Sequence, residues 1–323
     1  MPADCTIGVD LGGTNIKGGV CGSDGAVLAF ESRETQAKRG LKHVLTRMIA
    51  LIGDLPAKAG LSKADIHAVG VGSPGPLSHT EGVIHNAPNL PGWVNIPLRQ
   101  LLAEATGLPV VLENDANAAA FGEFVAGAGE NVSSMVMLTL GTGIGGGIVL
   151  DGQLWRGSDD AAAEIGHTVI VPGGRPCPCG QAGCLERYAS ANAVAERLIE
   201  AVRAGAGSSL RDRIEAGRLP DARDVLQAAD AGDDLANRIW DETCCYLALG
   251  CLNIEHVLSP ELIVLAGGLA NARERLLNPV RVRYANSRWN LTPLSLRVTL
   301  ATLGQQAGII GAAALARAYR PRS

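Results

Sequence analysis

One histidine and three cysteines stand at a spacing typical of a metal site. His167 is followed by Cys177, Cys179 and Cys184, and glycines among the cysteines permit a tight turn between ligands. One imidazole and three thiolates form a complete tetrahedral set for zinc, which leaves no coordination position open for water. The spacing therefore predicts a structural zinc ion. A redox pair of Cys177 and Cys179 is the alternative.

A glycine-rich loop near the N-terminus indicates phosphate binding. Residues 10–17, DLGGTNIK, follow an apolar run. Gly12 and Gly13 would let backbone N–H groups approach phosphate oxygens, and Thr14 adds a hydroxyl. Asp10 ends the expected strand and could hold a magnesium ion, most simply through water. The loop matches neither GxxxxGK[ST] nor GxGxxG, and alone it is equally compatible with an ordinary glycine-rich hairpin.

A second loop of this kind strengthens the phosphate interpretation. Residues 141–147 read GTGIGGG after another apolar run, and a third glycine pair at 267–268 follows ELIVLA. Two such loops facing each other would form a cleft for a polyphosphate. Together the three loops resemble the nucleotide site of the actin–hexokinase–Hsp70 superfamily.

A carboxylate between a strand and a helix is the candidate catalytic base. Asn114 and Asp115 end an expected strand and precede a helix. The Asp115 carboxylate could accept the proton of a substrate hydroxyl as that oxygen attacks phosphorus, which contributes about 10²–10⁴-fold to the rate. The same position would also allow Asp115 to cap the helix that follows.

Two further carboxylates flank the predicted metal ligands. Glu164 lies three residues before His167, and Glu186 lies two residues after Cys184. A zinc ion would orient these side chains, and a histidine ligated through one ring nitrogen can offer the other to a substrate hydroxyl. Carboxylates and an imidazole that converge in this way suit a polyol.

The elements that must position these residues occur in two copies. Residues 6–30 and 135–157 each contain an apolar run, a glycine-rich bend, a second apolar run, and an Asp-Gly pair before a third run. The Asp-Gly pairs at 24–25 and 151–152 predict hairpins with type I′ turns, which need positive φ. Each copy is thus predicted to be a three-stranded meander, and the repetition indicates a duplicated domain.

Helical and strand patterns alternate in the rest of the chain. We expect helices at 40–53, 97–106, 116–127, 188–206, 222–232, 233–251 and 305–319, and strands at 66–71, 109–112, 261–265 and 296–302. This alternation predicts an α/β fold. We expect a small lobe at 1–118, completed by the C-terminal helix 304–323, and a large lobe at 119–303 with the zinc-binding motif.

Composition excludes several classes of protein. The chain of 323 residues is 47% hydrophobic and 19% charged, so it can bury a large core and is not disordered. The formal charge of −4 argues against a nucleic-acid or anionic-membrane partner. No apolar run is long enough to span a bilayer, and the N-terminus lacks the pattern of a secretory signal. We expect a cytoplasmic protein with reduced cysteines.

Five motifs resemble the ROK (repressor, open reading frame, kinase) family. DLGGTNIKGGV, ENDANAAAFGE, LGTGIGGGIVLDG, AEIGH and CPCGQAGCLE follow one another over essentially the whole chain. Within the family, the resemblance is strongest to bacterial ATP-dependent glucokinases. It implies an actin-like (ribonuclease H-like) fold of duplicated domains, with two lobes around a nucleotide and sugar cleft. The implied reaction transfers phosphate from Mg-ATP to the 6-hydroxyl of glucose.

The resemblance also implies roles for individual residues. Asp115 would be the catalytic base. A zinc ion would be bound by His167, Cys177, Cys179 and Cys184. Sugar hydroxyls would be bound by Gly75, Asn89, Asn114, Asp115, Glu164, His167 and Glu186. ATP and Mg²⁺ would be bound by Asp10, Gly12, Gly13, Thr14, Lys17, Gly141, Thr142, Gly143, Gly267 and Gly268. The family also implies a homodimer or homotetramer.

Both the sugar and the class of protein have alternatives. Kinases for N-acetylglucosamine, N-acetylmannosamine, mannose and fructose share these motifs, although AEIGH and NAPNLPGW favour glucose. A non-catalytic, sugar-sensing repressor is the alternative from another class. The start of the first loop at Asp10 and the acidic charge argue against a DNA-binding domain. The chain departs from the family pattern at Pro178, between two cysteines, and at 160–163, which lack glycine.

Overall fold

A five-stranded mixed sheet organises the N-terminal part of the computed structural model, which describes residues 5–87, 89–288 and 296–318. The strand order is β3-β2-β1-β4-β8. β1, β2 and β3 form an antiparallel meander, whereas β4 runs parallel to β1 and β8 parallel to β4. The strands are β1 (Cys5–Leu11), β2 (Asn15–Cys21), β3 (Val27–Glu34), β4 (Ile66–Ser73) and β8 (Val110–Asn114). The first predicted meander is confirmed.

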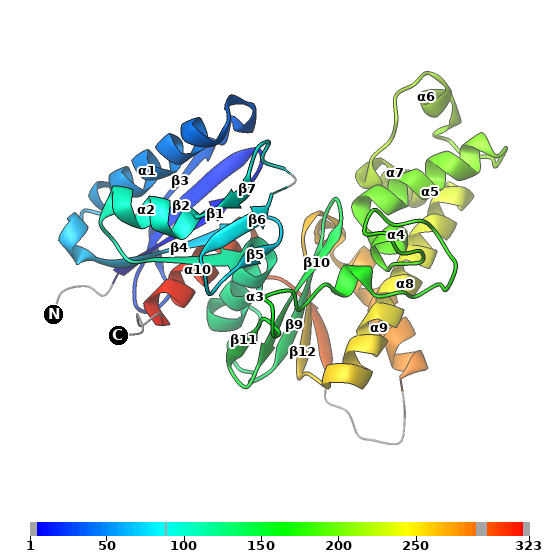
Figure 1. Cartoon of the computed structure of the whole chain (residues 1–323). Helices are drawn as coiled ribbons and strands as arrows, with labels where there is room; N and C mark the ends of the chain where they lie inside the picture. Colours follow the sequence, from blue (N-terminus) through cyan, green and yellow to red (C-terminus); the bar gives the residue numbers. More distant parts are fainter. Residues whose placement is uncertain (1–4, 88, 289–295, 319–323) are drawn as a thin grey trace. The chain divides into compact units, whose positions relative to one another are not determined.

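Helices cover both faces of this sheet (Figure 1). They are α1 (Leu41–Lys58), α2 (Leu98–Thr106), α3 (Asp115–Ala126) and α10 (Ala307–Ala318). α1 and α2 pack together on one face, and α3 and α10 pack together on the other. Successive residues of β2 show the alternation, since Gly18 faces Leu51 in α1 and Gly19 faces Ile309 in α10.

Glycines let α10 approach its neighbours at backbone distance. A Cβ on Gly8 would lie 1.9 Å from Ile309 O, and a Cβ on Gly311 would lie 1.7 Å from Ala118 O in α3. No side chain larger than hydrogen fits at these positions, so α10 rests directly on β1 and on α3. This contact fixes α3, whose first residue is Asp115, relative to the sheet.

A small third sheet lies within residues 72–97, which are rich in Pro and Gly. Its strands are β5 (Leu77–Ser78), β6 (Val83–Asn86) and β7 (Val94–Ile96), paired antiparallel in that order. Ile84 and Trp93 are buried in the same hydrophobic core as the first sheet and α1. The sheet therefore belongs to the N-terminal core.

The second large sheet repeats the strand order of the first, as β11-β10-β9-β12-β13. β10 and β11 are antiparallel, β12 runs parallel to β9, and β13 runs parallel to β12. The strands are β9 (Met135–Leu140), β10 (Ile144–Leu150), β11 (Gln153–Trp155), β12 (Leu262–Ala266) and β13 (Arg297–Leu300). The shared order confirms the predicted duplication.

Helices of the C-terminal half pack mainly around α8, which contacts α4, α5, α7 and α9. They are α4 (Glu186–Ala189), α5 (Ala191–Arg203), α6 (Arg211–Glu215), α7 (Ala222–Asp230), α8 (Asp234–Leu258) and α9 (Glu274–Ser287). The helix expected at 188–206 is divided, because the Ser190 hydroxyl caps α5 by accepting a hydrogen bond from Ala193 N (3.1 Å). The sequence patterns do not predict α9, which contains Pro279.

The two Asp-Gly pairs form different turns. At 151–152 both residues have positive φ, of 49° and 75°, as the predicted type I′ turn requires. At 24–25 only the glycine has positive φ, of 81°. The Asp24 carboxylate instead accepts a hydrogen bond from Ala26 N (3.0 Å), which stabilises a longer loop. The prediction of a type I′ turn is therefore wrong at the first pair.

The described residues fall into two compact units. The first comprises the chain up to Ser133, Gly147–Ala162 and the segment from Thr302 onward, and the second comprises Ser134–Gly146 and Ala163–Ala301. The first unit contains the expected small lobe with the C-terminal helix, and it also contains α3 and β11. The lobe boundary between 118 and 119 stays a prediction.

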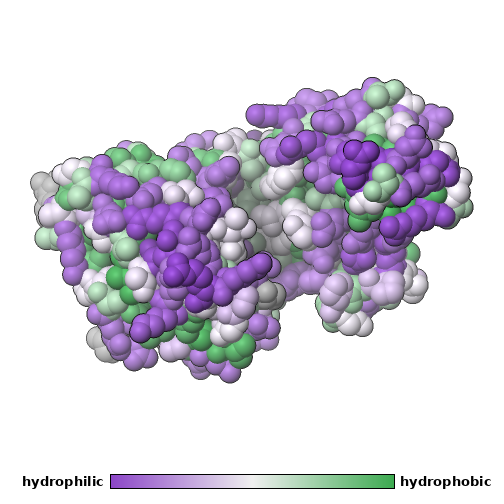
Figure 2. Space-filling view, turned by 90° about the horizontal axis from the view of Figure 1, so that it is seen from above, coloured by the Kyte–Doolittle hydropathy of each residue, from purple (hydrophilic) through white to green (hydrophobic). Residues whose placement is uncertain are grey.

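Exposed apolar side chains are dispersed over different elements. Phe30 in β3 and Val282 in α9 are examples. On the face drawn in Figure 2, hydrophilic residues predominate and apolar residues lie among them. Within the described part of the chain, no helix is both long enough and apolar enough to cross a bilayer.

We predict opposite effects on stability for two Gly→Ala substitutions in helices. Gly311→Ala places a methyl group against Ala118 O and should lower the free energy of unfolding by about 1–3 kcal/mol. Gly53→Ala in α1 meets no atom within 4 Å and should raise it by about 0.5–1 kcal/mol, the difference in helix propensity. Denaturant titration measures both. Equal changes in the two variants would contradict the close contact between α10 and α3.

Candidate active site and metal centre

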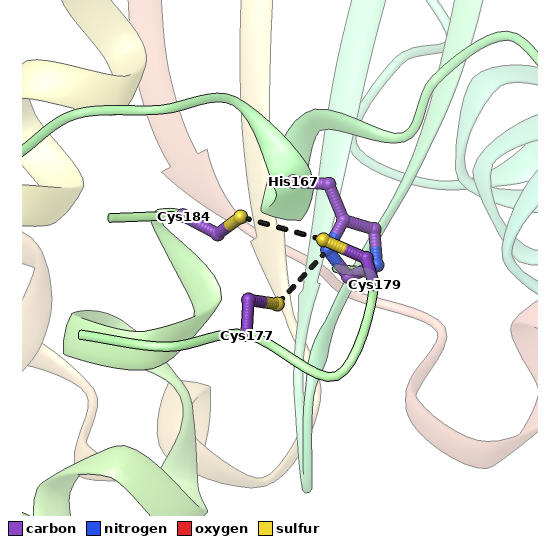
Figure 3. A group of neighbouring side chains, drawn as sticks. All are labelled: His167, Cys177, Cys179 and Cys184. Atoms are coloured by element: carbon purple, nitrogen blue, oxygen red, sulfur yellow. Dashed lines mark hydrogen bonds between the residues drawn. The ribbon is translucent and has the colours of Figure 1, made fainter. Parts of the chain in front are cut away.

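The four predicted metal ligands lie together (Figure 3), with all ligand atoms within 4.8 Å of one another. Cys179 Sγ is 3.6 Å from Cys184 Sγ, and Cys177 Sγ is 3.6 Å from His167 Nδ1. Ligands of a tetrahedral zinc ion, at bond lengths of about 2.0–2.3 Å, are separated by about 3.4–3.8 Å. The cluster therefore has the donor set of a tetrahedral metal site, and these two distances match such a site.

A tight turn brings the three cysteines together. Cys177 N donates to Gln181 O (2.8 Å) across the turn. Gly180 and Gly183 have φ of 94° and 88°, in the left-handed region. A Cβ on Gly183 would also lie 1.8 Å from Val171 O. These glycines are thus needed for the turn, as their places among the cysteines predict.

The thiols of the cluster differ in acidity. Burial, reinforced by the adjacent Cys179 and Cys177 thiols, raises the pKa of Cys184 to about 12. The pKa of the exposed Cys179 is lowered, chiefly by a hydrogen bond from the backbone of Gln181. Neighbouring thiolates repel one another, so deprotonation of all three would require a bound cation.

Glu164 precedes the short 3₁₀ turn η3 (Ile165–His167), and His167 is the last residue of this turn. His167 Nδ1 faces the Cys177 thiol, and His167 Nε2 lies 3.9 Å from Glu164 Oε2. The two ring nitrogens thus point in different directions. Nδ1 points toward the metal ligands, and Nε2 points toward the carboxylate of Glu164, whose side chain is 68% exposed. Ala163 adopts φ 70°, which costs a residue other than glycine roughly 1–2 kcal/mol.

Glu186, the first residue of α4, contacts the second glycine-rich loop. Its Oε2 accepts a hydrogen bond from Ile144 N (2.8 Å). A Cβ on Gly143 would lie 2.2 Å from the same oxygen. Gly141 N donates to Gly143 O (2.9 Å), which closes the turn around Thr142. The structure therefore brings a predicted sugar ligand together with a loop predicted to bind phosphate.

A pocket of about 370 Å³ adjoins the third glycine pair. It is lined by Ala191, Asp221, Ala222, Arg223, Leu226, Trp240, Gly268, Leu269, Asn271 and Ala272. Gly267, with φ of 87°, packs against the backbone of Leu140. Ala191 N donates to Gly141 O (2.9 Å), so the pocket begins beside the second glycine-rich loop. Sequence analysis identified only Gly268 of these residues, because they come from separate elements and share no motif.

In the first unit, the other predicted phosphate loop joins β1 to β2. Gly12 N donates to Asn15 O (2.9 Å), and Thr14 lies within this turn. Lys17 Nζ lies 3.8 Å from Asp10 Oδ2. Burial raises the pKa of Asp10, and the Lys17 charge partly opposes this effect. A half-buried carboxylate next to one cation is a suitable neighbour for a hydrated divalent ion.

Asn89 and Gly75 occupy different surroundings in this unit. A Cβ on Gly13 would lie 3.0 Å from the Asn89 Cβ, so Asn89 lies beside the first glycine-rich loop. Gly75 has φ of 86°, and a Cβ there would lie 2.1 Å from Asn86 O. The backbone therefore requires glycine at 75 whether or not this residue contacts a sugar.

Asp115 begins α3 at the end of β8. The N-cap of the helix is Asn114, whose Oδ1 accepts hydrogen bonds from Ala116 N (2.9 Å) and Asn117 N (3.2 Å). Asp115 Oδ1 accepts a hydrogen bond from Ala116 N (2.8 Å). The N-cap of α3 is therefore Asn114, and Asp115 is the first residue of the helix.

A buried carboxylate holds this junction between strand and helix. Glu113 is 2% exposed and accepts hydrogen bonds from Arg156 Nε (2.7 Å), Asn117 Nδ2 (3.1 Å) and Asn114 N (3.0 Å). These bonds fix the backbone on both sides of Asp115. Sequence analysis missed Glu113 as a positioning residue, although it stands in the same motif.

Within each unit, the structure brings some of the predicted residues together. The second unit brings together the metal ligands, both flanking glutamates and the loop at 141–143. The first unit holds the loop at 10–17 beside Asn89, and the start of α3. The functional roles of these residues remain predictions.

Comparison with known protein families matches residues 6–319 to the ROK family. The chain belongs to the ROK family. A glucokinase of Thermotoga maritima is 38% identical over 315 residues, which cover 98% of each chain.

Two solved structures of ROK proteins extend this similarity. A ROK hexokinase from Thermus thermophilus has 35% identity and a TM-score of 0.81, with 97% of each chain covered. A ROK glucokinase from Streptomyces griseus, solved with glucose and AMPPNP, has 33% identity and a TM-score of 0.79, with 97% of this chain and 99% of that chain covered. The predicted α/β, actin-like fold of duplicated domains is confirmed.

We predict that the chain binds one metal ion through the His167 cluster. Cys177→Ser should lose the ion and lower the melting temperature by about 5–10 °C, because the turn loses its cross-link. Cys245→Ser, at an exposed cysteine outside the cluster, is the matched control and should change neither quantity. Elemental analysis and thermal unfolding measure the two effects. Full metal content in Cys177→Ser would show that the ligand set is wrong.

Proposed function

We propose that this ROK protein is an ATP-dependent glucokinase, which transfers the γ-phosphoryl group of Mg-ATP to the 6-hydroxyl of glucose. The observation that carries the proposal is the placement of Asp115 at the start of α3, fixed by Glu113, in a chain 38% identical to a glucokinase. The complex of the Streptomyces griseus enzyme with glucose and AMPPNP supports the choice of sugar and of phosphoryl donor.

Asp115 acts as the general base in this proposal. Its carboxylate lies at the N-terminus of α3, where the helix dipole stabilises negative charge. The 6-hydroxyl gives its proton to Asp115 while its oxygen forms a bond to the γ-phosphorus, and the bond from that phosphorus to ADP breaks. Rate enhancement comes largely from orientation of the hydroxyl and from neutralisation of charge.

The sugar is held by side chains that accept and donate hydrogen bonds. Glu164 and Glu186 accept from hydroxyls, and His167 offers Nε2 because Nδ1 faces the metal ligands. Asn114 contacts the sugar through its amide nitrogen, since its oxygen caps α3. Asn89 and Gly75 are further proposed contacts.

The nucleotide occupies the glycine-rich loops and the pocket beside Gly268. The residues that line the pocket include Leu226 and Trp240, whose apolar side chains suit an adenine ring, and polar residues such as Asn271. The hydrogen bond from Ala191 N to Gly141 O supports this choice, because it joins the pocket lining to a loop predicted to bind phosphate. Magnesium would be held by Asp10 through water and would neutralise charge on the phosphates, with Lys17 nearby.

The metal of the His167 cluster is zinc in this proposal. Three thiolates and one imidazole form a soft, four-coordinate set that favours zinc and leaves no position for substrate. The ion therefore has a structural role and fixes the segments that carry Glu164 and Glu186. We further propose a cytoplasmic glycolytic enzyme that forms a homodimer or homotetramer, as its family resemblance implies.

We predict that Asp115→Asn lowers kcat at least about 10²-fold and leaves glucose affinity largely unchanged. ADP release is measured with Mg-ATP and glucose, mannose, fructose, N-acetylglucosamine and N-acetylmannosamine. Asp151→Asn, in the exposed turn after β10, should keep full activity as the control. Near-normal turnover of Asp115→Asn would contradict the assignment of the base. A preference of the wild type for another of these sugars would contradict the assignment of the substrate.

We predict that Leu226→Ala raises the KM for ATP about five- to tenfold without changing the KM for glucose, because an apolar wall of the nucleotide pocket is lost. Leu219→Ala, an exposed leucine outside the pocket, should leave both constants unchanged. Steady-state kinetics with each substrate varied separately gives the constants. A changed KM for glucose alone would mean that the pocket does not bind the nucleotide.

A further inference from the structure

The second glycine-rich loop, at 141–147, is predicted to bind phosphate, yet one of its backbone N–H groups donates a hydrogen bond to a carboxylate of the protein. Ile144 N, in that loop, donates to Glu186 Oε2 at 2.8 Å. A hydrogen bond from a backbone N–H to a carboxylate is charge-assisted and strongly directional. It fixes one oxygen of Glu186, and with it the orientation of the whole carboxylate group.

Ile144 also touches the other segment that carries a predicted sugar ligand. A Cβ on Gly166, two residues after Glu164, would lie 2.1 Å from Ile144 O. The N–H of Ile144 therefore faces Glu186, and its carbonyl lies against the backbone beside Glu164. One residue of the second glycine-rich loop thus contacts both segments next to the metal ligands.

Gly143 leaves room for the Glu186 carboxylate because it has no side chain. A Cβ at this position would lie 2.2 Å from Glu186 Oε2 and 3.1 Å from Glu186 Cδ. The obstructing atoms belong to the end of a flexible side chain, so the carboxylate could rotate away at little cost to folding. The expected effect is weaker binding of the ligand of this carboxylate. At Gly166 the obstructing atom is a backbone oxygen, and a side chain there would disturb the fold itself.

We propose that Gly143 and Ile144 are positioning residues for the sugar. The space at Gly143 and the N–H of Ile144 hold Oε2 of Glu186, so that this carboxylate presents its remaining hydrogen-bonding capacity to a sugar hydroxyl. The loop therefore contributes to sugar affinity in the absence of nucleotide. This inference rests on the proposed function only in taking a hexose as the ligand of Glu186.

The test is a double-mutant cycle on glucose affinity, measured by calorimetry without nucleotide. Gly143→Ala should raise the Kd for glucose about tenfold, because Glu186 leaves its position. In a Glu186→Ala background, the same substitution should change the Kd by less than about twofold, since Gly143 acts only through Glu186. Gly53→Ala, in α1 and outside every predicted site, has no atom within 4 Å of its Cβ and is the control for glucose affinity.

Metal content and melting temperature show that each variant is folded. An unchanged glucose Kd in Gly143→Ala, or an equal effect of this substitution in both backgrounds, would overturn the positioning role while leaving the glucokinase proposal intact. If the wild type binds mannose, fructose or an N-acetyl hexose in place of glucose, the cycle is run on that sugar. Absence of binding to every hexose would overturn both proposals.

Discussion

The grouping of one imidazole and three thiols within 4.8 Å of one another is the constraint on which the candidate sugar site depends. Between η3 and α4 the described chain forms turns and isolated bridges in place of helices or strands. Such a segment has no hydrogen-bond ladder of its own to fix it. The cluster joins both its ends, because His167 stands at one and Cys184 at the other. A bound metal ion would therefore set the positions of Glu164 and Glu186 together.

In the first unit, the position of the candidate catalytic residue is fixed by direct contact between backbones. The glycines of β1 and β4 let α10 lie on the sheet, where a Cβ on Gly70 would lie 1.8 Å from Ala312 O. Gly311 lets α3 lie equally close to α10. Because helices packed at this distance cannot slide without collision, the first turn of α3 is well fixed. Glu113 then needs to orient only the junction that carries Asp115.

Features with a local cause could be predicted from the sequence, and features made by distant segments could not. The metal ligands, the repeated meander and the start of α3 follow from spacing, periodicity and turn residues, and the structure contains each of them. The pocket beside Gly268 and the contact of Asn89 with Gly13 join segments far apart in sequence. Even a local turn can depend on its strands, since the pair at 24–25 follows a register shift at Val20/Cys21 that has no counterpart before 151–152.

The duplication gives the two glycine-rich loops a common property beyond the phosphate binding that is predicted for them. In each copy the loop joins the first two strands of the meander, and one of its glycines lies against a polar side chain that the family resemblance assigns to the sugar. Gly13 abuts Asn89, and Gly143 abuts Glu186. Phosphate binding alone requires backbone N–H groups that face outward, yet Ile144 N and Gly141 N are both used within the protein. The absence of a side chain at Gly143 is therefore explained at least as well by the carboxylate that it accommodates as by a phosphate.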